Sequence, residues 1–346
     1  MNVNILFGIS LITSGAFFSG SFSVPFKKIK DWKWETYWMV FSLGAYIIFP
    51  LVACLLFAPG FVSIITNSPP DVLWVVFLIG AVYGVGNLSF GLSLRYLGLT
   101  LGYALSLGLM LAIGTLIPPL IDGRLRLMMQ GPGGTLLIEG IVVACVGIAL
   151  SAWSGILKDK SLSDAKKRES ISEFNLAKGS LAAILVGFAG SALSLGFEQG
   201  APISDLATKQ GINPLFTILP VLVVLFSGTF VTTIIWCGYL GLKNKSLKDY
   251  ATGSNKKLTI NYTMGLIAGL LWISQFIIYG MGKSKMGPYT FTSWGILMAL
   301  TIAFATIWGL FRNEWKGAPV KVYVLMILSL IIIVASSFMI GISGAI

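Results

Sequence analysis

Long apolar stretches alternate with short clusters of charge along this chain of 346 residues. Cutting the sequence at every Asp, Glu, Lys and Arg leaves ten charge-free runs long enough, or nearly long enough, to form a membrane-spanning helix, which needs about 20 apolar residues. The runs are 1–26, 36–70, 72–94, 96–121, 140–157, 179–197, 210–242, 258–282, 286–311 and 322–346. They use almost the whole chain, so the pattern predicts an all-α integral membrane protein with ten transmembrane helices and no sizeable soluble domain.

The longest polar segment, residues 158–178, lies near the middle of the chain and is rich in basic residues. We expect it to be a solvated cytoplasmic linker between two five-helix repeats, residues 1–157 and 179–346. Because each repeat has an odd number of helices, the second must enter the membrane upside down relative to the first.

Short matches between the two halves support this inverted relation. Residues 18–28 align with residues 187–200 when one residue of slack is allowed. The aligned pairs are Gly20-Ser21 with Gly190-Ser191, Lys27-Lys28 with Glu198-Gln199, Gly84–Gly98 with Gly269–Gly282, and Tyr103 with Tyr289. Weak similarity between inverted halves is typical of secondary transporters, whose substrate sites lie near the membrane midplane where the repeats meet.

The charges indicate an orientation in the membrane. Hydrophobic residues make up 56% of the chain and charged residues 11%, and 24 basic residues outnumber 13 acidic ones. If the N-terminus is outside and the ten helices alternate, inward loops hold 19 basic residues and outward loops hold 5. This asymmetry follows the positive-inside rule. The basic excess therefore predicts outside termini, not a nucleic-acid partner.

Two predicted helices carry aromatic and amide side chains on one face. Within run 258–282, the positions i, i+3, i+4 and i+7 are Trp272, Gln275, Phe276 and Tyr279. Within run 72–94, the positions i, i+4 and i+7 are Tyr83, Asn87 and Phe90. Such a face can bind a sugar, with rings against its C–H surface and amides to its hydroxyls. The second face could equally hold helices together in the membrane.

Glu198 ends the apolar run 179–197. A charge at membrane depth costs roughly 2.5–3.5 kcal/mol on the insertion scale, so it usually faces a cavity or a partner. The chain has no histidine, so proton coupling would need a carboxylate or a lysine of lowered pKa. Glu198, Lys27 and Lys28 are therefore candidate proton-coupling residues. Alternatively, Glu198 caps the outer end of its helix, and the lysines extend to the inner surface.

The sequence shows none of the patterns that would predict an enzyme. There is no triad containing histidine, no phosphate-binding glycine loop after a strand, and no cluster with metal-ligand spacing. Cys54, Cys145 and Cys237 lie within apolar runs, where we expect them to act as small packing residues. Asp122 and Glu35 are expected at the membrane interfaces. We expect no metal and no cofactor.

Several short blocks in order along the chain resemble the L-rhamnose–proton symporter family, within the drug/metabolite transporter superfamily. The blocks are Val24–Trp38, Gly86-Asn87, Leu94–Gly98, Glu173–Leu176, Gly269–Trp272 with Gln275, Phe276 and Tyr279, and Asn313–Trp315. The resemblance spans almost the whole chain. It implies ten helices in a bacterial inner membrane and uptake of a 6-deoxyhexose, coupled to protons.

A site for such a sugar would draw on the residue types noted above: Trp272, Gln275, Tyr279, Asn87, Tyr83, Phe276 and Tyr289. The expected partners are the sugar, a proton and the lipid bilayer, and we expect a monomer. L-rhamnose, L-fucose and related sugars are not separated by the sequence. Two alternatives remain: an exporter or exchanger of another metabolite or drug on the same fold, and a receptor without transport.

Overall fold

The computed structural model describes residues 3–121, 123, 133–163, 171, 173–286 and 292–343. Within these residues the chain is helical and contains no strand, so the predicted all-α class is confirmed. The α-helices are α1 (Val3–Ser21), α2 (Trp34–Ser42), α3 (Phe49–Phe57), α4 (Phe61–Thr66), α5 (Pro70–Ile121), α7 (Gly134–Ser161), α9 (Leu176–Leu185), α10 (Ala192–Gln199), α11 (Ala201–Lys209), α12 (Leu219–Lys243), α13 (Asn255–Lys285), α14 (Thr292–Phe311) and α15 (Val320–Ser343). Short 3₁₀ or π segments join some of them: η1 (Val24–Lys28), η2 (Leu43–Ile48), η3 (Val186–Gly190) and η4 (Leu247–Tyr250).

Nine helical stretches in the described part of the chain are long and apolar enough to cross a membrane. Eight of them match a single predicted run each, whereas the stretch Pro70–Ile113 contains parts of two runs. A straight α-helix of its 44 residues would be about 66 Å long, more than twice the thickness of the hydrocarbon core of a bilayer.

Helix α5 is not straight, however, because it folds back at Gly98, whose backbone angles (φ 79°, ψ −176°) are not helical. Ser106 donates a hydrogen bond to Ser93 at 3.1 Å, and the rings of Phe90 and Tyr103 lie 5.0 Å apart. Residues 13 positions apart in a straight helix would be about 20 Å apart. The first arm of α5 (residues 70–97) and the second arm (residues 99–121) are therefore antiparallel neighbours.

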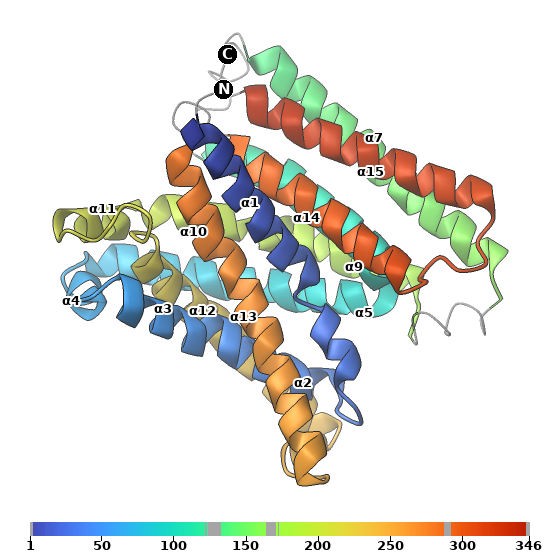
Figure 1. The fold of residues 1–346 in the computed structure, drawn as a ribbon, viewed down its shortest axis with the longest axis horizontal. Helices are drawn as coiled ribbons and strands as arrows, with labels where there is room; N and C mark the ends of the chain where they lie inside the picture. Colours follow the sequence, from blue (N-terminus) through green and yellow to red (C-terminus); the bar gives the residue numbers. More distant parts are fainter. Residues whose placement is uncertain are drawn as a thin grey trace.

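The two halves of the chain pack into each other (Figure 1). Helix α1 packs against α13 and α14, while α9, η3 and α10 pack against α5. Helix α2 packs against α13 and α12 packs against α5, and α7 lies beside α15 along one edge. Small residues make close approach possible: a Cβ atom at Gly80 would lie only 1.9 Å from the Leu225 carbonyl oxygen.

The bundle has two distinct ends. The start of α1 and the end of α15 lie at the same end (Figure 1), where Gly8 touches Gly282 near the end of α13. We call it the termini end. At the other end of α13, the Asn261 side chain accepts a hydrogen bond from the Lys30 amide at 3.1 Å. We call this the basic end, because 16 of the 19 described lysines and arginines belong to the helix ends and connections there.

An ion pair ties the connections of the basic end together. The Lys257 ammonium lies 2.7 Å from the Asp31 carboxylate. Its hydrogen bond lowers the pKa of Asp31 below the usual range for an aspartate. The contact joins the segment after η1 to the start of α13, so the first helix of the chain is held to α13 at this end as well as at the termini end.

Candidate functional site

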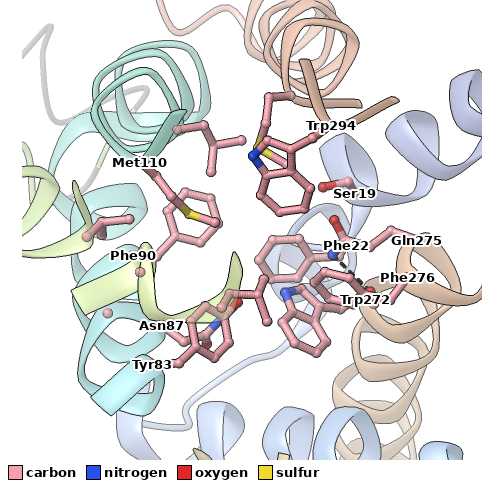
Figure 2. A pocket seen from close by; sticks show the side chains of 16 residues that line it. Ser19, Phe22, Tyr83, Asn87, Phe90, Met110, Trp272, Gln275, Phe276 and Trp294 are labelled. Atoms are coloured by element: carbon pink, nitrogen blue, oxygen red, sulfur yellow. Dashed lines mark hydrogen bonds between the residues drawn. The ribbon is translucent and has the colours of Figure 1, made fainter. Parts of the chain in front are cut away.

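A narrow cavity of about 30 Å³ lies inside the bundle where α1, both arms of α5, the η3–α10 segment, α13 and α14 meet. Figure 2 shows the labelled side chains converging on this space from different helices. The lining residues are Ser19, Phe22, Tyr83, Gly86, Asn87, Phe90, Leu107, Met110, Val186, Gly190, Leu193, Trp272, Gln275, Phe276, Trp294 and Met298. This volume is well below that of typical small-molecule sites, so the walls of the cavity have to move apart before it encloses a ligand.

The lining is aromatic and amidic, and no charged side chain belongs to it among the described residues. Its polar side chains are those of Ser19, Tyr83, Asn87 and Gln275. The remainder are rings, aliphatic side chains and glycines. Such a surface suits a neutral ligand that has both apolar faces and hydroxyl groups.

Helix α13 contributes Trp272, Gln275 and Phe276, all buried. The Gln275 amide nitrogen donates to the Trp272 carbonyl oxygen at 2.9 Å, which fixes the orientation of the amide (Figure 2). The Gln275 side-chain oxygen accepts no hydrogen bond from the described residues. It can therefore accept one from a ligand hydroxyl in the cavity.

On the first arm of α5, Asn87 belongs both to the cavity and to a contact between helices. The Tyr46 hydroxyl donates to the Asn87 side-chain oxygen at 2.5 Å, and the Asn87 amide nitrogen donates to the Tyr83 hydroxyl at 3.3 Å. This polar face therefore joins helices and also lines the cavity, while its binding of a sugar remains a prediction. Tyr46, in η2, was not found from the sequence, and a tyrosine in the middle of a charge-free run was the signal for it.

A second, wider hollow of about 490 Å³ opens at the basic end, and we call it the vestibule. Its charged lining residues are Lys27, Lys33, Arg95, Glu173, Arg312 and Glu314. Aromatic rings separate it from the cavity: Phe22 lies 6.1 Å from both Phe26 and Phe90, and Phe26 lies 5.8 Å from Trp38. Phe22 and Phe90 line the cavity, whereas Phe26 and Trp38 line the vestibule. We call these four rings the aromatic layer.

Comparison with known proteins identifies the family. A family model described as L-rhamnose-proton symport protein matches residues 1–345. The chain is 31% identical over 348 residues to proteins named L-rhamnose-proton symporter from Yersinia pestis (strain Pestoides F) and Yersinia pseudotuberculosis (serotype O:1b, strain IP 31758), and each alignment covers 100% of both chains. The chain belongs to the L-rhamnose–proton symporter family. The resemblance seen in the sequence is thus confirmed, and the protein is a multi-pass member of a transporter family, not an enzyme. No solved structure matches the chain.

In this protein, five of the predicted substrate-binding residues line one cavity: Tyr83, Asn87, Trp272, Gln275 and Phe276. Tyr279 does not line it, but its ring lies 5.8 Å from that of the lining residue Trp294. Tyr289 lies outside the described residues. That the lining residues bind substrate remains a prediction.

The structure does not bring together the three predicted proton-coupling residues, Glu198, Lys27 and Lys28. Glu198 is exposed and does not line the cavity. It lies at the termini end, because the nearby Gly200 contacts Val221 at the start of α12. Lys27 and Lys28 are exposed at the basic end. The two ends are far apart because Asn261 and Gly280, which mark them on α13, are separated by about 28 Å of helix. An apolar sequence before Glu198 did not imply a buried carboxylate.

Sequence reasoning missed the lining residues Ser19, Phe22 and Trp294 and those of the second arm of α5. Helical periodicity gives the face of a single helix, but it does not reveal which other helices turn toward that face. It also missed the burial of Glu35, which was expected at an interface. The residue is 4% exposed, and its carboxylate accepts hydrogen bonds from Asn244 and Ser246 after α12. Asp122 lies outside the described residues.

Proposed function

We propose that this protein takes up a 6-deoxyhexose, L-rhamnose foremost, together with a proton, by alternating access. The observation that carries the proposal is the uncharged cavity lined by rings and amides. A 6-deoxyhexose offers C–H patches and a methyl group to rings such as Trp272 and Phe276, and hydroxyls to Gln275 and Asn87. The names of the full-length Yersinia relatives point to the same substrate and to proton coupling.

The chemistry of the cavity disfavours the export or exchange of a charged drug or metabolite. A cation or a phosphorylated compound would need an opposite charge to offset its desolvation, and no charged residue belongs to the described lining. The cavity is built from one chain, so we expect a monomer to be sufficient for transport.

The proposed architecture is two inverted repeats of five crossings each, residues 1–157 and 179–346, joined by the basic linker 158–178. The fold-back at Gly98 supports counting the two arms of α5 as separate crossings. Ten crossings also agree with a chain whose α1 begins and whose α15 ends at the same end of the bundle (Figure 1). The packing of the helices supports the proposed repeat, because α1 packs on α13 and α14 much as the η3–α10 segment packs on the two arms of α5.

An uptake experiment tests the function. In cells lacking their own carriers, the protein should accumulate radiolabelled L-rhamnose when the outside is more acidic than the inside, and an uncoupler should abolish accumulation. L-fucose, added unlabelled, measures how strictly the sugar is selected. Equal uptake with and without the pH gradient would contradict proton coupling, and no uptake of any deoxyhexose would contradict the substrate class.

The orientation is a separate prediction. The basic end should face the cytoplasm of a bacterial inner membrane, because positive residues are retained on that side and most of the described ones belong to this end. A reporter fused after residue 346 should therefore report the periplasm, and one inserted in the connection between α12 and α13 should report the cytoplasm. The reverse pattern in a fusion that still transports sugar would overturn the assignment.

A further inference from the structure

Tyr46 lies behind the wall of the cavity without lining it. The residue is 1% exposed, and its ring packs against the lining residue Trp272 at 5.1 Å and against Phe226 at 5.7 Å. It belongs to the π-helical segment η2 between α2 and α3, and such segments frequently occur at functional sites. The one polar group of this side chain is its hydroxyl, so the partner of the hydroxyl shows how Tyr46 acts on the cavity.

The distances show which way round the Asn87 amide lies. The Tyr46 hydroxyl is 2.5 Å from the Asn87 side-chain oxygen, and the Asn87 side-chain nitrogen is 3.3 Å from the Tyr83 hydroxyl. An O–H···O bond spans about 2.5–3.0 Å, whereas N–H···O bonds are longer. The short contact therefore suits a hydroxyl donor and the long contact suits an amide donor. Tyr46 donates to Asn87, and Asn87 donates to Tyr83.

This chain of hydrogen bonds leaves the Tyr83 hydroxyl with a hydrogen to donate. A tyrosine hydroxyl accepts and donates at the same time, but it has only one hydrogen. Tyr83 accepts from Asn87 and donates to none of the described residues. Both Tyr83 and Asn87 line the cavity. A ligand in the cavity can therefore accept a hydrogen bond from Tyr83.

The opposite wall of the cavity offers the complementary group. The Gln275 amide nitrogen donates to the Trp272 carbonyl oxygen at 2.9 Å, which leaves the Gln275 side-chain oxygen to accept. Figure 2 shows Tyr83 and Asn87 on one side of the cavity and Gln275 on the other. The wall formed by α5 thus presents a donor, and the wall formed by α13 presents an acceptor.

A single hydroxyl of a ligand can satisfy both walls in one arrangement. Because it has one hydrogen, it can donate to Gln275 while it accepts from Tyr83. If the Asn87 amide turned over, its oxygen would accept from Tyr83, and the hydrogen of Tyr83 would no longer reach the ligand. Both walls would then offer acceptors, and a buried polar group left without its partner weakens binding.

We propose that Tyr46 is a positioning residue for the substrate, because its bond to Asn87 keeps Tyr83 a hydrogen-bond donor toward the cavity. This inference rests on the proposed binding of a sugar. The chemistry selected in this way is a hydroxyl that bridges α5 and α13, one helix from each proposed repeat. Among the described residues, only Tyr46 donates to the Asn87 side-chain oxygen. Without the Tyr46 hydroxyl, the amide can turn over.

Tyr46→Phe tests the proposal, because phenylalanine keeps the ring that packs on Trp272 and Phe226 and lacks only the hydroxyl. Calorimetry on the purified protein should show that L-rhamnose binds about three- to tenfold more weakly. Tyr262→Phe is the matched control, because the Tyr262 hydroxyl donates to the Tyr250 carbonyl oxygen at 2.8 Å at the basic end, away from the cavity. The control should bind L-rhamnose like the wild type. Wild-type affinity in Tyr46→Phe overturns the proposal.

Deoxy analogues of L-rhamnose, each lacking one ring hydroxyl, separate positioning from packing. The wild type should discriminate most strongly against the analogue that lacks the bridging hydroxyl. Tyr83→Phe removes the donor and should lose much of this discrimination, and Tyr46→Phe should lose it for the same analogue. Tyr262→Phe should retain it. If Tyr46→Phe binds L-rhamnose more weakly but discriminates among the analogues as the wild type does, its effect is one of packing and the proposal is overturned.

Infrared spectra recorded without sugar separate this proposal from the proposed function. The C–O stretching band of tyrosine differs between a hydroxyl that accepts and one that only donates, and subtracting the spectrum of Tyr83→Phe isolates the band of Tyr83. In the Tyr46→Phe background, this band should move to the position of a hydroxyl that only donates. If it moves while the wild type binds no deoxyhexose, the positioning role stands and the substrate assignment fails. An unmoved band means that Tyr46 does not orient the Asn87 amide, which overturns the proposal.

Discussion

Trp272→Ala is expected to weaken the binding of L-rhamnose at least tenfold. The Trp272 side chain is 2% exposed and forms part of the cavity wall, so its removal takes away a large ring surface for the C–H faces of the sugar. The ring also packs against Phe276 at 4.9 Å and Tyr46 at 5.1 Å, and truncation therefore destabilises the bundle as well. Calorimetry on purified protein that elutes as a single species gives the affinity.

Gln275→Ala separates recognition from packing more cleanly. It removes the amide oxygen that is available to a sugar hydroxyl, and a buried group left unpaired costs roughly 1–3 kcal/mol, or about five- to 150-fold in affinity. Ser274→Ala is the matched control, because the neighbouring Ser274 is outside the cavity lining and its hydroxyl donates a hydrogen bond to the Leu270 carbonyl oxygen in its own helix. Unchanged affinity in a folded Gln275→Ala protein would contradict the assignment of the cavity as the sugar site.

The residues of this site show what sequence periodicity can and cannot predict. Trp272, Gln275 and Phe276 were identifiable because positions i, i+3 and i+4 of a helix share a face, which requires only local geometry. Trp294 and Met110 line the same space from other helices. Which helices face the cavity depends on how the chain packs across hundreds of residues, and no local pattern encodes it.

The acidic residues make the same point. Glu198 follows an apolar run, yet it is exposed, because a helix face turned away from the protein interior can be as apolar as the interior in a membrane protein. Glu314 lies between clusters of charge in the sequence, yet it is buried, and its carboxylate accepts hydrogen bonds from Leu99 and Thr100, which are more than 200 residues away. Its block was recognisable as a family feature, but its contact with the fold-back required the structure.

The fold-back itself gives the other large expected effect: Gly98→Ala should destabilise the protein and abolish transport. The φ of 79° and ψ of −176° at Gly98 fall in a region that is essentially restricted to glycine. Forcing another residue into it costs about 1–3 kcal/mol. A Cβ atom there would also lie 2.6 Å from the Ile171 side chain and 2.9 Å from a Glu314 carboxylate oxygen. The clash pushes Glu314 away from the N–H groups that it caps, so strain and loss of the cap act together.

Two glycine controls separate these causes when thermal unfolding is followed in detergent. Gly211 also has a positive φ, of 81°, but a Cβ atom there would meet nothing within 4 Å, so Gly211→Ala reports backbone strain alone, about 1–2 kcal/mol. Gly238 lies inside α12, and a Cβ atom there would also meet nothing within 4 Å. Because alanine favours a helix more than glycine does, Gly238→Ala should leave the stability unchanged or slightly higher. Gly98→Ala should unfold at a clearly lower temperature than both and should fail to accumulate sugar. If it is no less stable than Gly211→Ala, then neither the turn between the two arms nor the contact with Glu314 depends on a glycine at this position.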